Sequence, residues 1–207
     1  MEQLIRPRAA AEVRTVAALG TAPVLLGASP GQREDLAGYL ALGGYRPPTG
    51  PEELLRLLHA ADLRGRGGAG FPAARKLEGV LAQPPGPRVA VANAAEGEPA
   101  SVKDRFLARR RPHLLLDGLA HAAAAIAADR AYIQVSDRTA AASLAEALAE
   151  RPPTVPVTVS LVAEAYVAGE ESAVVRHLGG GPALPTAKPP RVFEHGVDEA
   201  MNQVNRS

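Results

Sequence analysis

The chain has 207 residues, of which 46% are hydrophobic, 22% charged and 3% aromatic, and its net charge is +1. This length and balance suit one domain with its own core, whereas the near-neutral charge and the scarce aromatic residues argue against nucleic-acid partners. The sequence has no cysteine, which excludes disulfides, thiolate zinc sites and a cysteine-ligated iron–sulfur cluster in this chain. No apolar run resembles a signal peptide or reaches transmembrane length, so we expect a cytoplasmic protein without membrane insertion.

The first part of the chain, residues 1–62, is expected to be a mostly helical N-terminal extension. Hydrophobic spacing predicts helices over residues 9–19 and 30–42, with a short extended segment at residues 23–27 between them. After a proline-rich break, residues 51–61 form the next predicted helix, and its leucines are expected to make a buried stripe.

A glycine-rich stretch at residues 63–72 follows, with four glycines within six positions between two arginines and a Phe-Pro pair. Successive backbone N–H groups of such a bend can bind an anion, and Arg66, Arg75 or Lys76 could add positive charge. The alternative is a flexible loop between helices. The spacing of its glycines formally matches a dinucleotide fingerprint, but that fingerprint needs a preceding strand. Because a helix precedes the stretch here, an ordinary Rossmann NAD loop is rejected.

Strands and helices alternate in the rest of the chain, which predicts an α/β fold with a mainly parallel sheet. The third strand is expected near a sheet edge because it contains Pro156. The predicted strands cover residues 88–92, 131–135 and 155–162, and the predicted helices cover residues 72–83, 112–128, 138–150 and a segment that ends near residue 178.

Two acidic clusters stand next to predicted sheet elements. The first, at residues 93–99, follows the first strand, where open α/β sheets collect their ligands. The second, Glu170 and Glu171, precedes the last helix. Carboxylates there could accept hydrogen bonds from ligand hydroxyls, or they could be a solvated turn and a favourable helix start. The arginines at residues 109–111 are expected to form a solvated surface run, and the five scattered histidines predict no metal site.

These motifs together resemble a known family. Residues 63–72 with Lys76, residues 93–99 with residues 103–105, residues 166–173, and residues 188–190 are similar, in order, to four signatures of the NADH-binding flavoprotein subunit of respiratory complex I. That family includes the diaphorase subunits of hydrogenases and formate dehydrogenases.

The resemblance implies an FMN cofactor on a Rossmann-like domain, with NADH as the hydride donor and no catalytic side-chain nucleophile. The residues that it assigns to the flavin and its phosphate are Gly65, Arg66, Gly67 and Lys76. Those that it assigns to the ribityl chain and the isoalloxazine are Asn93, Glu96, Tyr166, Gly169 and Glu170. Those that it assigns to the nicotinamide nucleotide are Phe71, Glu98, Glu171 and Lys188.

The sequence departs from the family pattern at several positions. Ala95 stands where an aspartate is usual, Gly79 and Arg191 stand where phenylalanines are usual, and Ala168 replaces a cysteine. The expected domains are the extension at residues 1–62, the FMN-binding domain at residues 63–190 and a tail at residues 191–207. The chain is expected to be truncated, without the family's iron–sulfur domain.

Two functions follow as hypotheses. The first is an FMN module that takes hydride from NADH and passes electrons to a separate acceptor, such as a ferredoxin or another acceptor subunit. The alternative is a non-catalytic remnant that binds a nucleotide or a partner subunit.

Overall fold

Three parallel strands form the centre of the computed structural model, in the order β1, β2, β3. The strands are β1 (Val89–Ala94), β2 (Arg130–Val135) and β3 (Val157–Leu161). The structure describes residues 24–27, 31–47, 50–66, 69–96, 101–162, 171–182 and 184–185, and the side chain of Glu171 lies outside this description.

Helices connect the strands, and the alternation confirms the predicted α/β class. The helices that precede the sheet are α1 (Leu36–Ala41), α2 (Pro51–Ala60) and α3 (Ala73–Leu81). Those that follow β1 are α4 (Lys103–Arg110), α5 (Pro112–Ala125), α6 (Arg138–Glu150) and α7 (Glu171–Leu178). None of the helices in the described ranges combines the length and the apolar character that crossing a bilayer requires.

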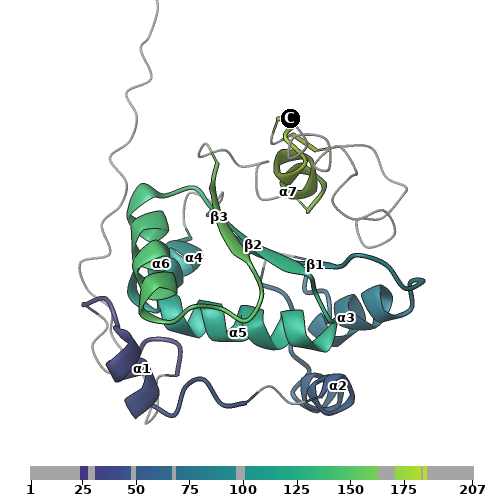
Figure 1. Cartoon of the computed structure of the whole chain (residues 1–207), viewed down its shortest axis with the longest axis horizontal. Helices are drawn as coiled ribbons and strands as arrows, with labels where there is room; N and C mark the ends of the chain where they lie inside the picture. The colour runs from purple at the N-terminus through teal and green to yellow at the C-terminus, as the bar shows by residue number, and fades with distance from the viewer. Residues whose placement is uncertain are drawn as a thin grey trace, which may run out of the picture.

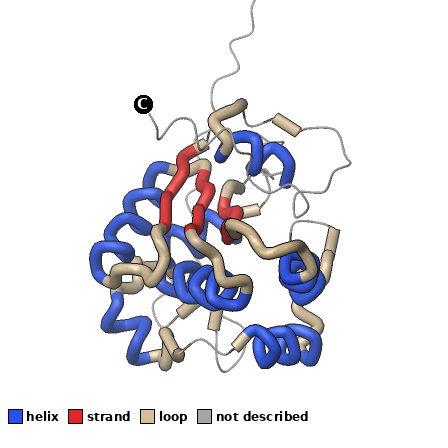
Figure 2. Tube along the Cα trace, turned by 45° about the vertical axis from the view of Figure 1, so that its right-hand side comes forward, coloured by secondary structure: helices blue, strands red, loops and turns tan. Residues whose placement is uncertain are grey.

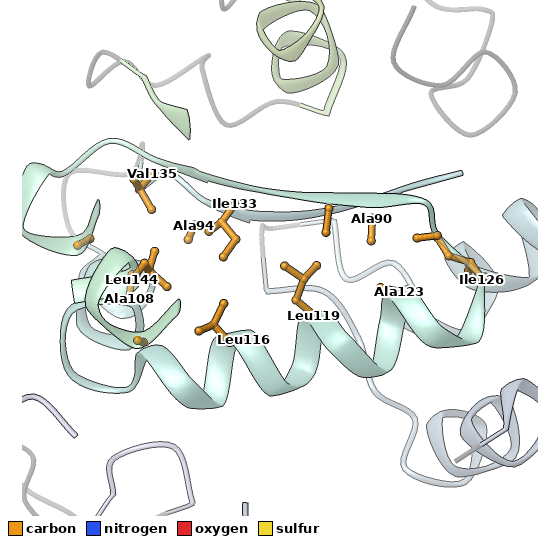
Figure 3. Close-up of a cluster of buried hydrophobic side chains, with 14 residues drawn as sticks. Ala90, Ala94, Ala108, Leu116, Leu119, Ala123, Ile126, Ile133, Val135 and Leu144 are labelled. Carbon is orange, nitrogen blue, oxygen red and sulfur yellow. The ribbon is translucent and has the colours of Figure 1, made fainter. Parts of the chain in front are cut away.

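The main core lies between the sheet and the helices α5 and α6 (Figures 1 and 3). The sheet contributes small side chains such as Ala90, Ala94 and Ala131, and α5 contributes Leu116 and Leu119. Small residues on the sheet let the helices approach closely, so that larger side chains fill the remaining space at high density. Ile133 of β2 and Leu144 of α6 are fully buried there.

The opposite face of the sheet is covered by α7 (Figure 1). Tyr132 of β2 packs against Val174 and Leu178 of α7, with Val89 at the edge of this small cluster. Figure 2 shows α3 on the β1 side of the sheet, and Leu77 and Val80 of α3 pack against the main core. The segment before β1 and the segment after β3 therefore approach the same sheet from different sides.

The N-terminal segment at residues 31–47 is fastened to α5 by buried polar contacts. Asp117 accepts hydrogen bonds from the Tyr39 hydroxyl at 2.7 Å and from the Tyr45 backbone N–H at 2.9 Å. His113 is fully buried, and its two ring nitrogens contact the Tyr45 hydroxyl and the Glu150 carboxylate, each at 2.9 Å. Because buried polar groups are costly without partners, this network fixes the segment in one position.

Three expectations about the N-terminal extension are wrong in detail. Residues 24–26 form a turn rather than an extended segment, and Gly27 has a φ of +71° next to the Arg111 side chain. Helix α1 begins at Leu36 instead of residue 30, because the Asp35 side chain accepts a hydrogen bond from the Gly38 N–H and caps the helix there. No residue of α2 is fully buried, so its leucines do not form the expected buried stripe: Leu54, Leu55 and Leu58 are half-buried, and Leu57 is exposed.

The arginine run at residues 109–111 is not a solvated surface patch. Arg111 is 3% exposed, and its guanidinium lies 2.7 Å from the Glu34 carboxylate. Arg109 forms an ion pair with Asp137. Burial raises the pKa of Glu34, although the nearby positive charge of Arg111 opposes the shift. Charged side chains are buried here because each meets a partner from a distant part of the chain.

We expect Asp117→Ala to lower the free energy of unfolding by about 3 kcal/mol, because two buried donors, the Tyr39 hydroxyl and the Tyr45 N–H, lose their acceptor. Urea unfolding of the wild type and the variant measures this difference. Glu52→Ala, which removes an exposed carboxylate from α2, is the control and should leave stability nearly unchanged. A loss no greater than that of the control would contradict the anchoring role of Asp117.

Candidate functional site

The glycine-rich stretch forms a closed loop between α2 and α3. The Gly65 N–H donates to the Phe71 carbonyl at 2.9 Å, and the Ala73 N–H donates to the Leu63 carbonyl at 2.8 Å. Gly70 has a φ of +60°, a conformation that strongly favours glycine. The loop is therefore tied at its base, and a helix precedes and follows it as the sequence predicts. Gly67 and Gly68 lie outside the described residues.

Positive charge and uncapped helix amides meet at this loop. Arg64 pairs with Asp62 at 2.9 Å, whereas the exposed Arg66 has no side-chain partner among the described residues. Pro72 precedes α3 without a side-chain cap, and Lys76 is exposed in the early part of that helix. An uncapped helix N-terminus with adjacent cations suits a phosphate group.

Asn93 lies within β1, because the strand extends two residues beyond the predicted end at residue 92. In the strand register, Asn93 lies opposite Gln134 of β2, and Gln134 lies opposite Ser160 of β3. This row shares a sheet face with Tyr132, which contacts α7. The Ser160 hydroxyl lies 3.2 Å from the His177 ring of α7. The carboxyl ends of the strands thus carry polar side chains on the α7 side of the sheet, and Asn93 is exposed there.

Glu96 follows β1 directly and is only 4% exposed. One carboxylate oxygen accepts a hydrogen bond from the Asp104 backbone N–H at 2.8 Å, and the other lies 3.3 Å from the Lys103 ammonium. Burial tends to raise the pKa of Glu96, but hydrogen bonds from Ser101, Asp104 and Lys103 outweigh it and leave that pKa below its ordinary value. Glu96 is therefore an ionised carboxylate that binds the first turn of α4.

The described residues contain about half of the predicted site. Gly65, Arg66, Phe71 and Lys76 lie together on the loop and the start of α3, and Asn93 and Glu96 lie at the end of β1. Phe71 is 40% exposed, so its ring is accessible to a ligand that would stack on it. Outside the described residues lie Gly67, Glu98, Tyr166, Gly169, Glu170, Lys188 and the side chain of Glu171. Convergence of the three clusters in one cleft stays a prediction.

Several polar residues near this region were not predicted as functional. Gln134 and Ser160 extend the row that begins with Asn93, and a polar residue inside an apolar strand was the available signal. Lys103 and Ser101 were missed as partners of Glu96, although Lys103 belongs to the second signature. Within the described ranges, no group of three or more histidine, aspartate or glutamate side chains could hold a metal ion.

Comparison with known proteins identifies the family. The sequence profile of the Nuo51 FMN-binding domain matches residues 58–205. The chain belongs to this family. It is 36% identical over 191 residues to the F 2 subunit of NADH-quinone oxidoreductase of Rhizobium meliloti (strain 1021), a match that covers 82% of this chain and 45% of that protein. It is 35% identical over 179 residues to the F subunit of NADH-quinone oxidoreductase of Aquifex aeolicus (strain VF5), with coverages of 77% and 42%.

A solved structure supports the same assignment. The crystal structure of an NAD+-reducing NiFe hydrogenase in the H2-reduced state matches 71% of this chain and 27% of that chain, with a TM-score of 0.64 and 36% identity. The Nuo51-family resemblance and the Rossmann-like fold predicted from the sequence are both confirmed. The chain spans less than half the length of these two relatives. Membership of the family therefore does not establish that this chain has their complete activity.

We expect the Glu96 carboxylate to stabilise the fold above its ordinary pKa of 4.5, and this contribution to be lost as the pH falls through the lowered folded-state pKa. The Glu96→Gln variant lacks this contribution at every pH, because an amide does not ionise. The difference in melting temperature between the wild type and the variant should therefore shrink between about pH 6 and about pH 3.

The matched control for this experiment is Glu53→Gln. Glu53 also pairs with a cation, that of Arg56, but it is exposed on α2, so its pair contributes little. A difference between the wild type and Glu96→Gln that is independent of pH would show that Glu96 acts through packing rather than through its charge.

Proposed function

We propose that this chain binds FMN, accepts hydride from NADH onto the bound flavin, and passes electrons to a separate acceptor protein. The observation that carries the proposal is the closed glycine loop in front of the uncapped helix α3, within a region that matches the Nuo51 FMN-binding domain. The names of two related proteins support the use of NADH, because an NADH-quinone oxidoreductase subunit and an NAD+-reducing hydrogenase share this region.

The residues of the loop fit the phosphate of FMN. Backbone N–H groups at the start of α3 have no side-chain cap, and Arg66 and Lys76 are exposed beside them. An anion bound there would accept hydrogen bonds from N–H groups of the first helical turn that have no intrahelical partner, and it would lie near two cations. Phosphate binding would fix one end of the cofactor, because the loop is held at both ends by its two backbone hydrogen bonds.

The end of β1 fits the other part of the cofactor. Asn93 offers an amide donor and an acceptor on the exposed sheet face. Glu96 would act indirectly, since its carboxylate binds the first turn of α4. Glu98 belongs to the connection between β1 and α4 and is proposed, with Phe71, Glu171 and Lys188, to bind the nicotinamide nucleotide.

Bound FMN supplies the hydride acceptor, and the side chains bind and orient. Phe71 would stack on the nucleotide, and the acidic residues would receive its hydroxyl and amide hydrogens. Tyr166, Gly169 and Glu170 are proposed to line the flavin, as the family resemblance implies. An iron–sulfur cluster is not proposed within these residues, because they include no cysteine.

A second function has one observation in its favour. Ala95, where the family usually has an aspartate, is 8% exposed and packs against Val162. An apolar contact therefore replaces a polar flavin contact, which favours a remnant that binds a nucleotide or a partner subunit without catalysis.

We expect Lys76→Ala and Arg66→Ala each to weaken FMN binding by about tenfold or more, because one charge-assisted contact to the phosphate is lost. Riboflavin, which lacks the phosphate, should bind the wild type and both variants with similar affinity. Flavin fluorescence titration measures both ligands. Arg56→Ala is the control, since Arg56 is an exposed cation on α2. Equal losses for FMN and riboflavin would contradict a phosphate role.

We expect the purified, FMN-loaded chain to lose its oxidised-flavin absorbance when NADH is added without oxygen, because hydride reduces the flavin. Sodium dithionite provides the fully reduced reference. Flavin that binds and is reduced by dithionite but not by NADH would select the non-catalytic alternative. A chain that takes up no FMN would refute the proposed function.

A further inference from the structure

Four arginines line a cavity of about 340 Å³ between α4, α6 and the N-terminal segment. Arg105, Arg109 and Arg110 come from α4, and Arg33 comes from the segment before α1. Phe106 and Glu146 also line it. We call this cavity the arginine groove. It is lined by none of the residues assigned above to the flavin or to NADH.

Arg33 and Arg109 are held by carboxylates of the protein itself. Arg33 lies 2.8 Å from Glu150 and 3.3 Å from Glu146, and Arg109 pairs with Asp137. These contacts fix the guanidinium groups in place, so the groove is preorganised before any ligand arrives.

The Arg110 side chain has a different environment. It is half-buried, and among the described residues its guanidinium has no hydrogen-bond or ion-pair partner. Its backbone carbonyl accepts a hydrogen bond from the Glu34 N–H at 2.8 Å, which fixes the position of the main chain. A partly desolvated guanidinium on a fixed backbone is suited to a two-pronged contact with a carboxylate.

The balance of charge limits the ligand. Four arginines and one carboxylate, that of Glu146, line the groove, so its lining is positively charged. Asp137 and Glu150 pair with Arg109 and Arg33 beside it. A single carboxylate is repelled less by these neighbouring acidic side chains than a multiply charged phosphate is. Phe106 and Ala142 add apolar surface that suits the methylene groups of an acidic side chain.

We propose that the arginine groove is a docking site for an acidic segment of a partner protein, with a glutamate or aspartate side chain bound to Arg110. The site is independent of flavin binding, because it uses other residues. Apart from Arg33, its lining residues come from α4 and α6 and from no strand of the sheet, and Figure 1 shows these two helices next to each other.

The test uses a hexaglutamate peptide with blocked ends as the probe and isothermal titration calorimetry as the measurement. We expect binding that weakens as salt is added and that weakens about tenfold or more in Arg110→Glu, where attraction becomes repulsion. Arg110→Lys should lose less, since it keeps the charge but not the planar fork. Arg46→Glu is the matched control, because Arg46 is an exposed arginine outside the groove.

Three results would overturn the proposal: no binding of the peptide, equal weakening in Arg110→Glu and Arg46→Glu, or tighter binding of inorganic pyrophosphate than of the peptide. The last result would indicate a site for small phosphate anions instead. Melting temperatures of all variants are measured alongside, and a folded Arg110→Glu that has lost the peptide while Arg46→Glu retains it supports the docking site.

Discussion

The contact between the alanine-lined side of the sheet and the helices α5 and α6 holds the fold together. Ala90, Ala94 and Ala131 bring the helix leucines close to the strands, and this close approach excludes water from the core (Figure 3). The scarcity of aromatic residues makes such packing necessary, because a core without large rings must gain its stability from many small, close contacts. The strand ends that carry Asn93 and Glu96 are positioned by this contact.

Polar contacts then attach the remaining segments to that core. The N-terminal segment binds α5 through Asp117 and His113, the start of α4 is bound by Glu96, and α7 meets the sheet through Tyr132 and His177. Each attachment joins residues from different elements, and each satisfies polar groups that would otherwise be costly inside the protein. Asn93 and Glu96, two residues of the predicted flavin site, lie at the carboxyl end of β1, and Glu96 itself makes the attachment to α4.

Local signals in the sequence were enough for much of the fold. Helix α6 has the predicted bounds, because Asp137 caps its first turn and its alanines and leucines keep helical spacing. The β3 strand lies at the sheet edge, as Pro156 indicated. The glycine loop has a helix on each side, as the sequence predicted.

Other features depend on partners that are remote in the sequence. The local pattern predicts Arg111 to be a surface residue, because its partner Glu34 belongs to another segment and nothing nearby indicates the pair. The β1 strand continues through Asn93 and Ala94, residues of low strand preference, because β2 pairs with both. The sequence indicates Glu96 as a ligand contact, and its burial against α4 is visible only once the helix direction is known. Secondary-structure propensity and the spacing of hydrophobic residues describe the local sequence only, so they do not indicate such contacts.

Helix α4 joins two regions that have been described separately. Its first turn is held by Glu96, and its last turn carries Arg109 and Arg110. With 8 residues, the helix is about 12 Å long. A protein seated on the last turn of α4 would thus lie only the length of one short helix away from the end of β1.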